Sequence, residues 1–461
     1  MGTDAPTTIF IPIHCAPKKA PCPKCGQSGK RKRTCTRAVR TVAYKVVAFL
    51  RITYGEYAAG CQCCKTFRTT PEDVLPKAHY DNKVRDLVLD RILEDGMSIE
   101  RVLESLRREF LLELSTGFVY DVLRDRAKQL DMSQHRRRIL DHFSGTLCVD
   151  ELHLGRFTLL LATDPLNDLP VAFALVAAND QIHMLRFLKN LKNWGLEPRV
   201  VVTDGSNLYP AVLAELWSQA DHQLCVFHVI KDINKLILDA VRRLRNAMAR
   251  RGKAGRKKKR GRKSRKAKAA AARRGLASKE KANFVFKRRY LIVKRRQNLT
   301  ELERDDLKRM LEYLPELSIL RRFADRVYWL FDTPKDFHQA CCRRAEILHD
   351  PAFQTVPELV KAMGQLDDEK FPKLMAFLNN PLSQRVRTNN HVERTNRMFR
   401  FLEKVRYKWR RRRTLVRFVV LKLGEIWRAW ESSKDHATDQ PKSARRRETQ
   451  AQASQRSRRV A

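Results

Sequence analysis

The sequence lacks any apolar run of the roughly 18–20 residues that a membrane-spanning helix needs. Its first apolar stretch, residues 9–13, is too short and too interrupted by proline for a signal peptide. These absences exclude membrane-spanning and secreted classes of protein. We therefore expect a soluble, intracellular protein with no membrane partner.

Acidic residues are scarce relative to basic ones. The 461 residues include 94 Lys and Arg but 51 Asp and Glu, which gives a net charge of +43. Such an excess opposes compaction unless a polyanion neutralises it, so nucleic acid is the predicted partner, and an anionic membrane surface is only the alternative that the charge permits. Residues 242–274 contain eighteen Lys or Arg and no acid, and predict an unfolded or transiently helical arm that binds polyanions.

The eleven cysteines do not indicate a disulfide framework, because their number is odd and intracellular thiols stay reduced. Five of them cluster, as Cys22-x-x-Cys25 and as Cys61-x-Cys63-Cys64, on either side of strand-like sequence. Two such knuckles can supply four thiolates to one tetrahedral Zn²⁺ in a zinc ribbon. We expect Cys22, Cys25, Cys61 and Cys64 as ligands, and Cys63 could replace Cys61 or Cys64.

Helical periodicity extends from about residue 80 to 132 in three segments. Ser98 is the expected N-cap of the second segment, and Ser115 or Thr116 that of the third. Three short helices with tight turns predict a helix-turn-helix that binds DNA. A generic helical bundle is the alternative.

After a basic connector, residues 134–140, the pattern changes to an α/β plan. Three strands in a meander are expected, then a helix, a strand, a helix and a fifth strand in a mixed sheet. Their ranges are 146–155, 156–165, 169–180, 182–195, 199–205, 207–217 and 222–230, in that order.

Two aspartates stand where this sheet could hold a cation. Asp150 lies inside the first strand, and Asp204 ends the fourth. If those strands are neighbours, the two carboxylates can share a divalent ion such as Mg²⁺. Taken alone, Asp204 fits an Asx turn or a helix cap equally well. Glu151 should point away from Asp150, and Asp164 is a reserve carboxylate.

A third carboxylate lies on a polar helix face far downstream. Asn389, Glu393, Asn396 and Arg400 recur at spacings of 4, 3 and 4, which places them on one side of a helix. An ordinary solvated face is the alternative interpretation.

In this order, the zinc ribbon, the helix-turn-helix and the motifs CVDELHLG, VVVTDGSNLYP, CVFHVIKDINK and NNHVERTNR resemble the DDE transposases of bacterial insertion sequences. The resemblance implies a ribonuclease-H-like core with a helical insertion, and Asp150, Asp204 and Glu393 as catalytic ligands of two Mg²⁺ or Mn²⁺ ions. It also implies that polar residues near Glu393 serve the DNA or the site: Asn389, Asn390, Asn396, Arg397 and Arg400. For His228, a structural or DNA-contacting role is expected, with zinc binding by Cys225 and His228 as the alternative.

The expected activity is transposition: binding of terminal inverted repeats, DNA cleavage and strand transfer into target DNA. The resemblance implies a homodimer or larger assembly on DNA, in the cytoplasm and at the nucleoid of a bacterium. A catalytically retired, zinc-containing DNA-binding regulator is the second hypothesis, and an RNA-binding protein or RNA nuclease the third.

The expected fold is multidomain α/β, and six segments are predicted. They are a zinc ribbon (1–75), a helix-turn-helix (76–135), the first part of the ribonuclease-H-like core (136–235), a basic and helical insertion (236–380), the final core helices with Glu393 (381–435) and a disordered basic tail (436–461).

Overall fold

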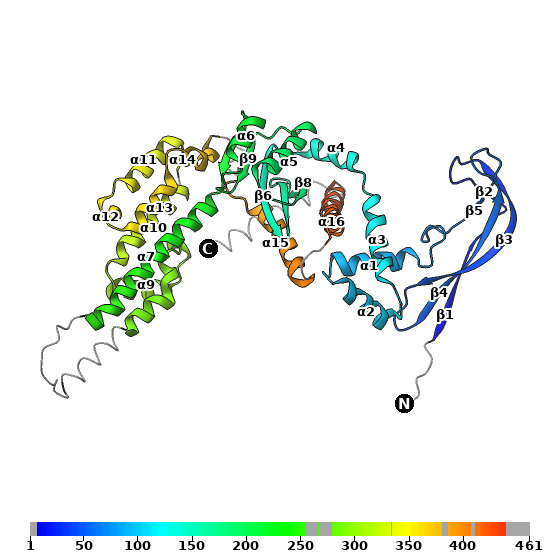
Figure 1. Cartoon of the computed structure of the whole chain (residues 1–461), viewed down its shortest axis with the longest axis horizontal. Helices are drawn as coiled ribbons and strands as arrows, with labels where there is room; N and C mark the ends of the chain where they lie inside the picture. The colour runs from blue at the N-terminus through cyan, green and yellow to red at the C-terminus, as the bar shows by residue number, and fades with distance from the viewer. Residues whose placement is uncertain are drawn as a thin grey trace. The chain divides into compact units, whose positions relative to one another are not determined.

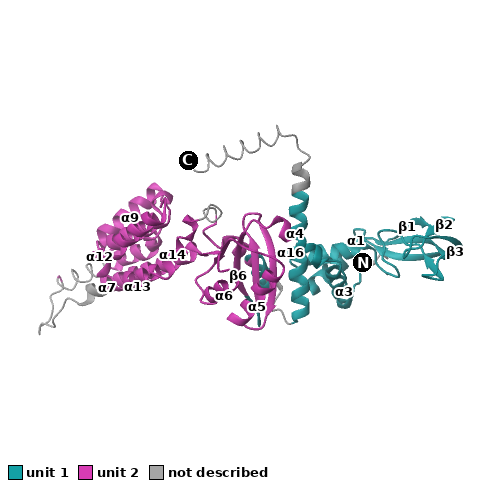
Figure 2. Ribbon diagram, turned by 90° about the horizontal axis from the view of Figure 1, so that it is seen from above, with its two compact units in different colours: residues 1–138, 153–157, 397–461 teal, residues 139–152, 158–396 magenta. Residues whose placement is uncertain are grey.

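The computed structural model describes residues 7–254, 266, 279–332, 334–379, 386–406 and 411–438. The chain divides into two compact units (Figure 2). Unit 1 comprises Met1–Arg138, His153–Phe157 and Arg397–Ala461, and unit 2 comprises Ile139–Leu152 and Thr158–Asn396. None of the helices in the described ranges is both long enough and apolar enough to cross a membrane.

Unit 1 begins with a mixed sheet of five strands (Figure 1). These are β1 Thr8–Cys15, β2 Lys19–Pro21, β3 Ser28–Thr41, β4 Val47–Ala58 and β5 Thr66–Arg68. The order is β1-β4-β3-β2, and β5 pairs with β4. β1 is parallel to β4, and the other pairs are antiparallel. The cysteine knuckles lie in the β2–β3 and β4–β5 connections, as expected of a zinc ribbon.

The three expected helices follow, as α1 Asn82–Leu93, α2 Ile99–Phe110 and α3 Thr116–Lys128. The predicted caps are confirmed, because Ser98 and Ser115 accept the N–H of the third residue after each. Asp81, which is fully buried, caps α1 in the same way.

The basic connector expected at residues 134–140 is helical, which was not predicted, and forms part of helix α4, Met132–His142. Asp131 explains the helix start, since its Oδ1 accepts the N–H groups of Ser133 and Gln134. Helix α16, Arg412–Thr438, contacts α1 and α3 within unit 1. Lys422 on α16 donates to Glu94 at 2.9 Å.

The second sheet has the order β10-β9-β6-β7-β8. Its strands are β6 Thr146–Leu154, β7 Phe157–Asp164, β8 Leu169–Val176, β9 Val200–Thr203 and β10 Asp221–Leu224. β10, β9 and β6 are parallel, whereas β7 and β8 are antiparallel. Helices α5, Gln181–Asn193, and α6, Pro210–Leu216, connect the later strands. This is the mixed α/β arrangement expected of a ribonuclease-H-like core.

One strand prediction needs correction. Residues 222–230 were expected to form one strand, but β10 ends at Leu224 and helix α7, Val226–Ala254, begins two residues later. The apolar positions explain the difference, because Val229, Ile233 and Ile237 continue at helical spacing into a buried core. A short apolar run does not distinguish strand from helix by itself.

A helical region with its own core extends from α7 to residue 379. Its further helices are α9 Glu301–Tyr313, α10 Leu317–Asp332, α11 Phe337–Leu348, α12 Pro351–Gln354, α13 Pro357–Met363 and α14 Lys370–Leu374. Short 3-10 turns lie between them, at Arg289–Ile292, Arg296–Asn298, Gly364–Leu366 and Ala376–Leu378. Helix α15, Asn390–Arg406, follows.

The predicted basic arm divides at residue 254. Residues 242–254 continue helix α7, so this part of the arm is helical, whereas the sequence left an unfolded and a transiently helical state open. The rest of the arm lies outside the described residues apart from Lys266, as does nearly all of the predicted tail, residues 436–461.

Candidate active site

Asp150 and Asp204 belong to neighbouring parallel strands of the second sheet. The register of β6 and β9 pairs Cys148 with Val202. Continuing this register by two residues sets Asp150 level with Asp204. Because neighbouring strands are about 4.8 Å apart, both carboxylates lie at the same edge of the sheet.

The Asp150 carboxylate lies in an environment that disfavours its charge. Burial, with the nearby carboxylates of Glu151 and Asp204, raises its pKa to about 7. A hydrogen bond from Asn396 Nδ2 to Asp150 Oδ2, 2.7 Å long, opposes this rise. A carboxyl group with such a pKa is readily occupied at neutral pH by a proton or a cation.

Asp204 also forms the Asx turn that the sequence permitted. Its Oδ1 accepts the N–H of Ser206 at 2.9 Å, so the carboxylate ends β9 and fixes the following turn. The turn engages only Oδ1. The turn role and a cation-binding role therefore use different oxygens of one side chain.

Helix α15 is tied to β6 at its first turn. Asn389, fully buried just before the helix, donates from Nδ2 to the carbonyl of Val149 at 2.9 Å. Its backbone N–H donates to Cys225 Sγ at 3.2 Å. With the Asn396 bond to Asp150, two amides of α15 hold it against the strand that carries the first aspartate.

Glu393 lies one helical turn beyond Asn389 and is partly buried. Its Oε1 is 3.3 Å from His228 Nε2, near the start of α7. His228 therefore contacts the third predicted carboxylate directly.

Several oxygen atoms here are buried without a hydrogen-bond donor. They are Asn389 Oδ1, Asn396 Oδ1 and Glu393 Oε1, the last of which lies within ion-pair distance of His228 Nε2 but accepts no hydrogen bond from it. Buried acceptors are normally paired, so an unpaired group of them needs an explanation. Oxygen atoms of this kind are the ligands that hard cations take.

The three predicted carboxylates do not converge on one point. Among the described residues, the cysteine cluster alone has three or more possible ligand atoms that all lie within 4.8 Å of one another. Repulsion between Asp150 and Asp204, and the pairing of Glu393 with His228, favour this spread arrangement.

Glu151 makes a separate set of contacts. Its Oε2 accepts the Tyr209 hydroxyl, and its Oε1 accepts Asn179 Nδ2 at 3.3 Å. Tyr209 is fully buried. Sequence reasoning did not identify these two partners. The sequence does show Tyr209 in the turn after Asp204. No local sequence pattern, however, links Tyr209 to Glu151.

Cys225 and His228 lie at the start of α7, where residues three apart share one side of the helix, and not on a straight strand as expected. Cys225 Sγ accepts the Asn389 N–H, and burial raises the pKa of the Cys225 thiol. Neither residue belongs to a group of possible metal ligands in the described ranges. The contacts favour the structural role for both.

Asp164, the reserve carboxylate of the sequence analysis, has a structural role. Its oxygens accept the N–H and hydroxyl of Ser144, both at 2.7 Å, and donors from Leu166 and Asn167. It therefore organises the turn after β7.

The β7–β8 turn also holds helix α15. Asp168, with a left-handed φ of 59°, pairs with His391 and with Arg394, the latter at 2.8 Å. These contacts were not predicted. They fix the turn of the helix that presents Glu393.

The remaining predicted residues lie on the outside of α15. Asn390, Arg397 and Arg400 are exposed, unlike Asn389 and Asn396. The expected single polar face is therefore divided: Asn389 and Asn396 are buried and support the site, whereas Arg400 is exposed.

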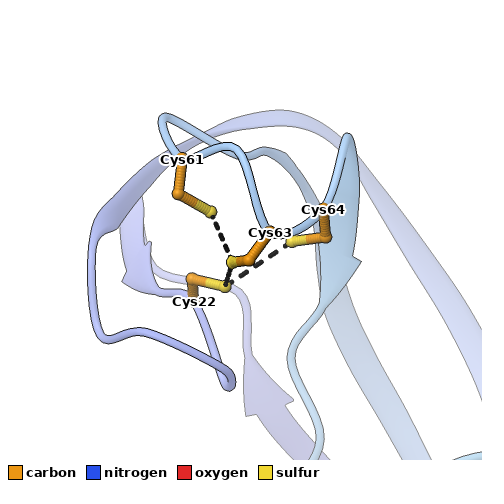
Figure 3. Close-up of side chains that lie close together, drawn as sticks. All are labelled: Cys22, Cys61, Cys63 and Cys64. Atoms are coloured by element: carbon orange, nitrogen blue, oxygen red, sulfur yellow. Dashed lines mark hydrogen bonds between the residues drawn. The ribbon is translucent and has the colours of Figure 1, made fainter.

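The cysteine cluster lies in unit 1 (Figure 3). The four converging thiols are Cys22, Cys61, Cys63 and Cys64. Cys25, which spacing predicted as a ligand, lies 3.4 Å from Cys63 but outside the converging group. Backbone hydrogen bonding by Lys24 lowers the pKa of Cys22 to about 6, which favours the thiolate that zinc binds. The cluster is compatible with a zinc-ribbon site.

Comparison with known proteins identifies a family. No curated protein matches the chain. The family model of the ISL3 transposases, which are DDE transposases, matches residues 147–407. This range is more than half of the chain and includes Asp150, Asp204 and Glu393. The chain therefore belongs to the ISL3 family of DDE transposases.

Proposed function

We propose that this transposase cleaves and joins DNA with Asp150, Asp204 and Glu393 as ligands of divalent cations. The observation that carries the proposal is the level placement of Asp150 and Asp204 on neighbouring strands, with the pKa of Asp150 raised to about 7. Two carboxylates at one sheet edge repel each other, and a shared cation relieves that repulsion.

The residues present fit Mg²⁺ or Mn²⁺. All three proposed ligands are carboxylates, and the unpaired amide oxygens of Asn389 and Asn396 lie beside them. When bound, two such ions lower the pKa of an attacking water or 3′-hydroxyl and stabilise the departing oxygen of the phosphodiester.

The protein's own residues orient these ligands. Asn396 fixes one oxygen of Asp150, and the turn to Ser206 fixes one oxygen of Asp204. Asn389 locks the start of α15 to β6, and His228 contacts Glu393. No side chain has to form a covalent bond to DNA, because water and the freed 3′-hydroxyl are the nucleophiles.

DNA is the proposed substrate and target. We assign recognition of the terminal inverted repeats to the zinc ribbon and the three helices α1, α2 and α3. Two ends must be processed together, so we expect a dimer or larger assembly on DNA, at the nucleoid of a bacterial cell.

Asp204→Asn tests the proposal. It retains the Asx-turn acceptor but removes the charge, so Mg²⁺-dependent strand cleavage should be lost while binding to the terminal repeats is kept. Glu197→Gln, on an exposed carboxylate, is the matched control and should cut normally. Cutting by the Asp204 variant at the wild-type rate would remove this residue from the catalytic site.

The second hypothesis, a retired regulator, predicts a different result. In that case the wild-type protein binds the terminal repeats but does not cut them with Mg²⁺ or Mn²⁺. The three intact carboxylates argue against it.

A further inference from the structure

Two aromatic rings are exposed beside the basic arm. Phe286 lies on the helical segment 279–288, and Tyr290 lies in the 3-10 turn Arg289–Ile292 that follows. The two side chains are 41% and 57% exposed. Large exposed aromatics are unfavourable in water, so a pair of them calls for a partner.

Arginine side chains flank these rings. Arg289 lies over both, 4.3 Å from the Phe286 centroid and 4.4 Å from that of Tyr290. Arg245, on helix α7, lies 4.8 Å from the Phe286 centroid. The contact between Arg245 and Phe286 shows that the two helices leading into and out of the basic arm lie side by side here.

Among the described residues, no acid neutralises the charges of these two arginines. In the described ranges no carboxylate lies within ion-pair distance of Arg245 or Arg289, and Arg245 Nε is buried without a hydrogen-bond partner. Nearby basic residues differ, because Arg288 pairs with Asp306 and Lys294 with Glu303. The exposed rings therefore carry positive charge that is available to an anion.

The neighbouring ring of Phe284 has a structural role in packing. Phe284 is half-buried, packs edge-to-face on Tyr313 at 5.4 Å, and lies under Arg288 at 4.0 Å. That arginine is neutralised by Asp306. An aromatic ring that serves packing in this domain is thus partly buried, and its arginine is neutralised by an acid. Phe286 and Tyr290 are exposed, and their arginines have no such acid among the described residues.

We propose that Phe286, Tyr290, Arg245 and Arg289 form a stacking platform for unpaired nucleotides of DNA. Bases stack, whatever their sequence, on exposed aromatic faces and on the guanidinium planes that lie over them, and the same arginines neutralise the adjoining phosphates. Duplex DNA keeps its bases stacked internally, so the rings distinguish unpaired strands from duplex. The proposal rests on DNA being the substrate, but not on the identity of the catalytic carboxylates.

The position of the platform supports this assignment. It lies on the helical segments on either side of residues 255–278, which contain twelve Lys or Arg and no acid. Phosphate contacts from such a stretch give affinity without selecting between strands. The rings supply the preference for unpaired bases that the charges cannot.

The test measures binding of the full-length protein to two probes. One is a short oligothymidylate strand that carries a single 2-aminopurine, and the other is a blunt duplex of equal length. Replacing Phe286 and Tyr290 by Leu keeps apolar bulk but removes the rings. Affinity for the strand should fall by on the order of tenfold or more, and the quenching of 2-aminopurine on binding should be lost. Affinity for the duplex should stay within about twofold of wild type.

Matched variants separate stacking from other causes. The single variant Phe286→Trp keeps an aromatic ring at this position. Its affinity for the strand and its quenching of 2-aminopurine should therefore stay at wild-type levels. Leu302→Ala removes an exposed apolar side chain that is 79% exposed elsewhere in the same domain, and should change neither. A parallel fall in strand and duplex affinity, or unchanged quenching in the double Leu variant, would overturn the platform. Because no probe is cut in this assay, its outcome is independent of the Asp204 cleavage test.

Discussion

At the scale of single residues, the ionised carboxylate of Asp150 lowers the stability of the folded protein. A carboxyl group whose pKa in the folded protein exceeds its unfolded value of about 3.9 holds its proton more tightly when folded. With a pKa of about 7, its contribution to stability is present at low pH and is lost as the pH rises through about 7. A site that weakens the fold when empty is typical of ligands positioned for function.

This gives a pH-dependent prediction for Asp150→Asn in chelator-treated protein. The neutral amide avoids the cost of ionisation, so the variant should be more stable than wild type above about pH 7, by on the order of 2–4 kcal/mol. Near pH 6 the difference should shrink. Thermal unfolding at the two pH values measures this difference in stability. The control variant Glu197→Gln should have the stability of the wild type at both pH values. Equal stability of variant and wild type at high pH would contradict the raised pKa.

Asn396 gives a second prediction at this scale. Its amide stabilises ionised Asp150, so Asn396→Ala should raise the pKa of Asp150 further. The acidic limb of the pH profile of cleavage should then move to higher pH, by roughly one unit. Glu197→Gln, at an exposed position away from α15, should leave the profile unchanged. A lower rate without a shifted limb would assign Asn396 a merely structural role.

The two central aspartates could be predicted from the sequence, because strand order alone brings them together. Their supports could not. Tyr209 meets Glu151 across 58 residues of chain, and Asp168 meets His391 only once the β7–β8 turn and α15 are packed. Such pairs depend on tertiary packing, which no local pattern encodes.

At the scale of elements, local capping explains which boundaries could be predicted. Ser98 and Ser115 begin α2 and α3 as expected, because a cap is a contact between residues three apart. The boundary between β10 and α7 was missed, since its apolar residues satisfy strand and helix patterns alike until Ile233 and Ile237 are counted.

Asp81 links the first sheet to the first helix, and its replacement tests that link. It caps α1 by accepting the Val84 N–H at 3.0 Å, and it accepts the hydroxyl of buried Thr41. Asp81→Ala should cost about 2–4 kcal/mol of unfolding free energy, from the lost cap and the unpaired hydroxyl. Chemical denaturation measures the loss. Asp86→Ala, on the exposed side of the same helix, should change stability by less than about 0.5 kcal/mol.

The two knuckles of the zinc ribbon allow a test of its ligand set. Cys63 belongs to the four converging thiols and Cys25 does not, so Cys63→Ser should lose bound zinc while Cys25→Ser keeps it. Metal content of the purified variants measures this directly. The reverse result would restore the set that the Cys-x-x-Cys spacing predicts, with Cys22, Cys25, Cys61 and Cys64. One contact favours that reverse outcome: Cys61 and Cys63 are 3.0 Å apart, whereas sulfurs of a tetrahedral zinc site lie about 3.8 Å apart.

At the scale of the whole molecule, the net charge of +43 dominates binding to DNA. Each neutralised phosphate releases counterions, so affinity falls steeply as salt rises. Replacing the twelve Lys and Arg of residues 255–278 by Gln keeps the length of the segment but removes its charge. The slope of log affinity against log salt concentration should become shallower by several units. An unchanged slope would show that this segment makes no phosphate contacts.

The packing of α16 has a consequence for the order in which the chain is made. This helix contacts α1 and α3, and its Trp427 is buried. The ribosome makes α1 and α3, which we assign to DNA recognition, early in synthesis. Their packing partner α16 is made only after the catalytic core. A product released early, before residue 412, would leave the apolar surface of those helices uncovered. We therefore expect premature termination to yield protein that is degraded, and not a DNA-binding fragment that competes with the intact transposase.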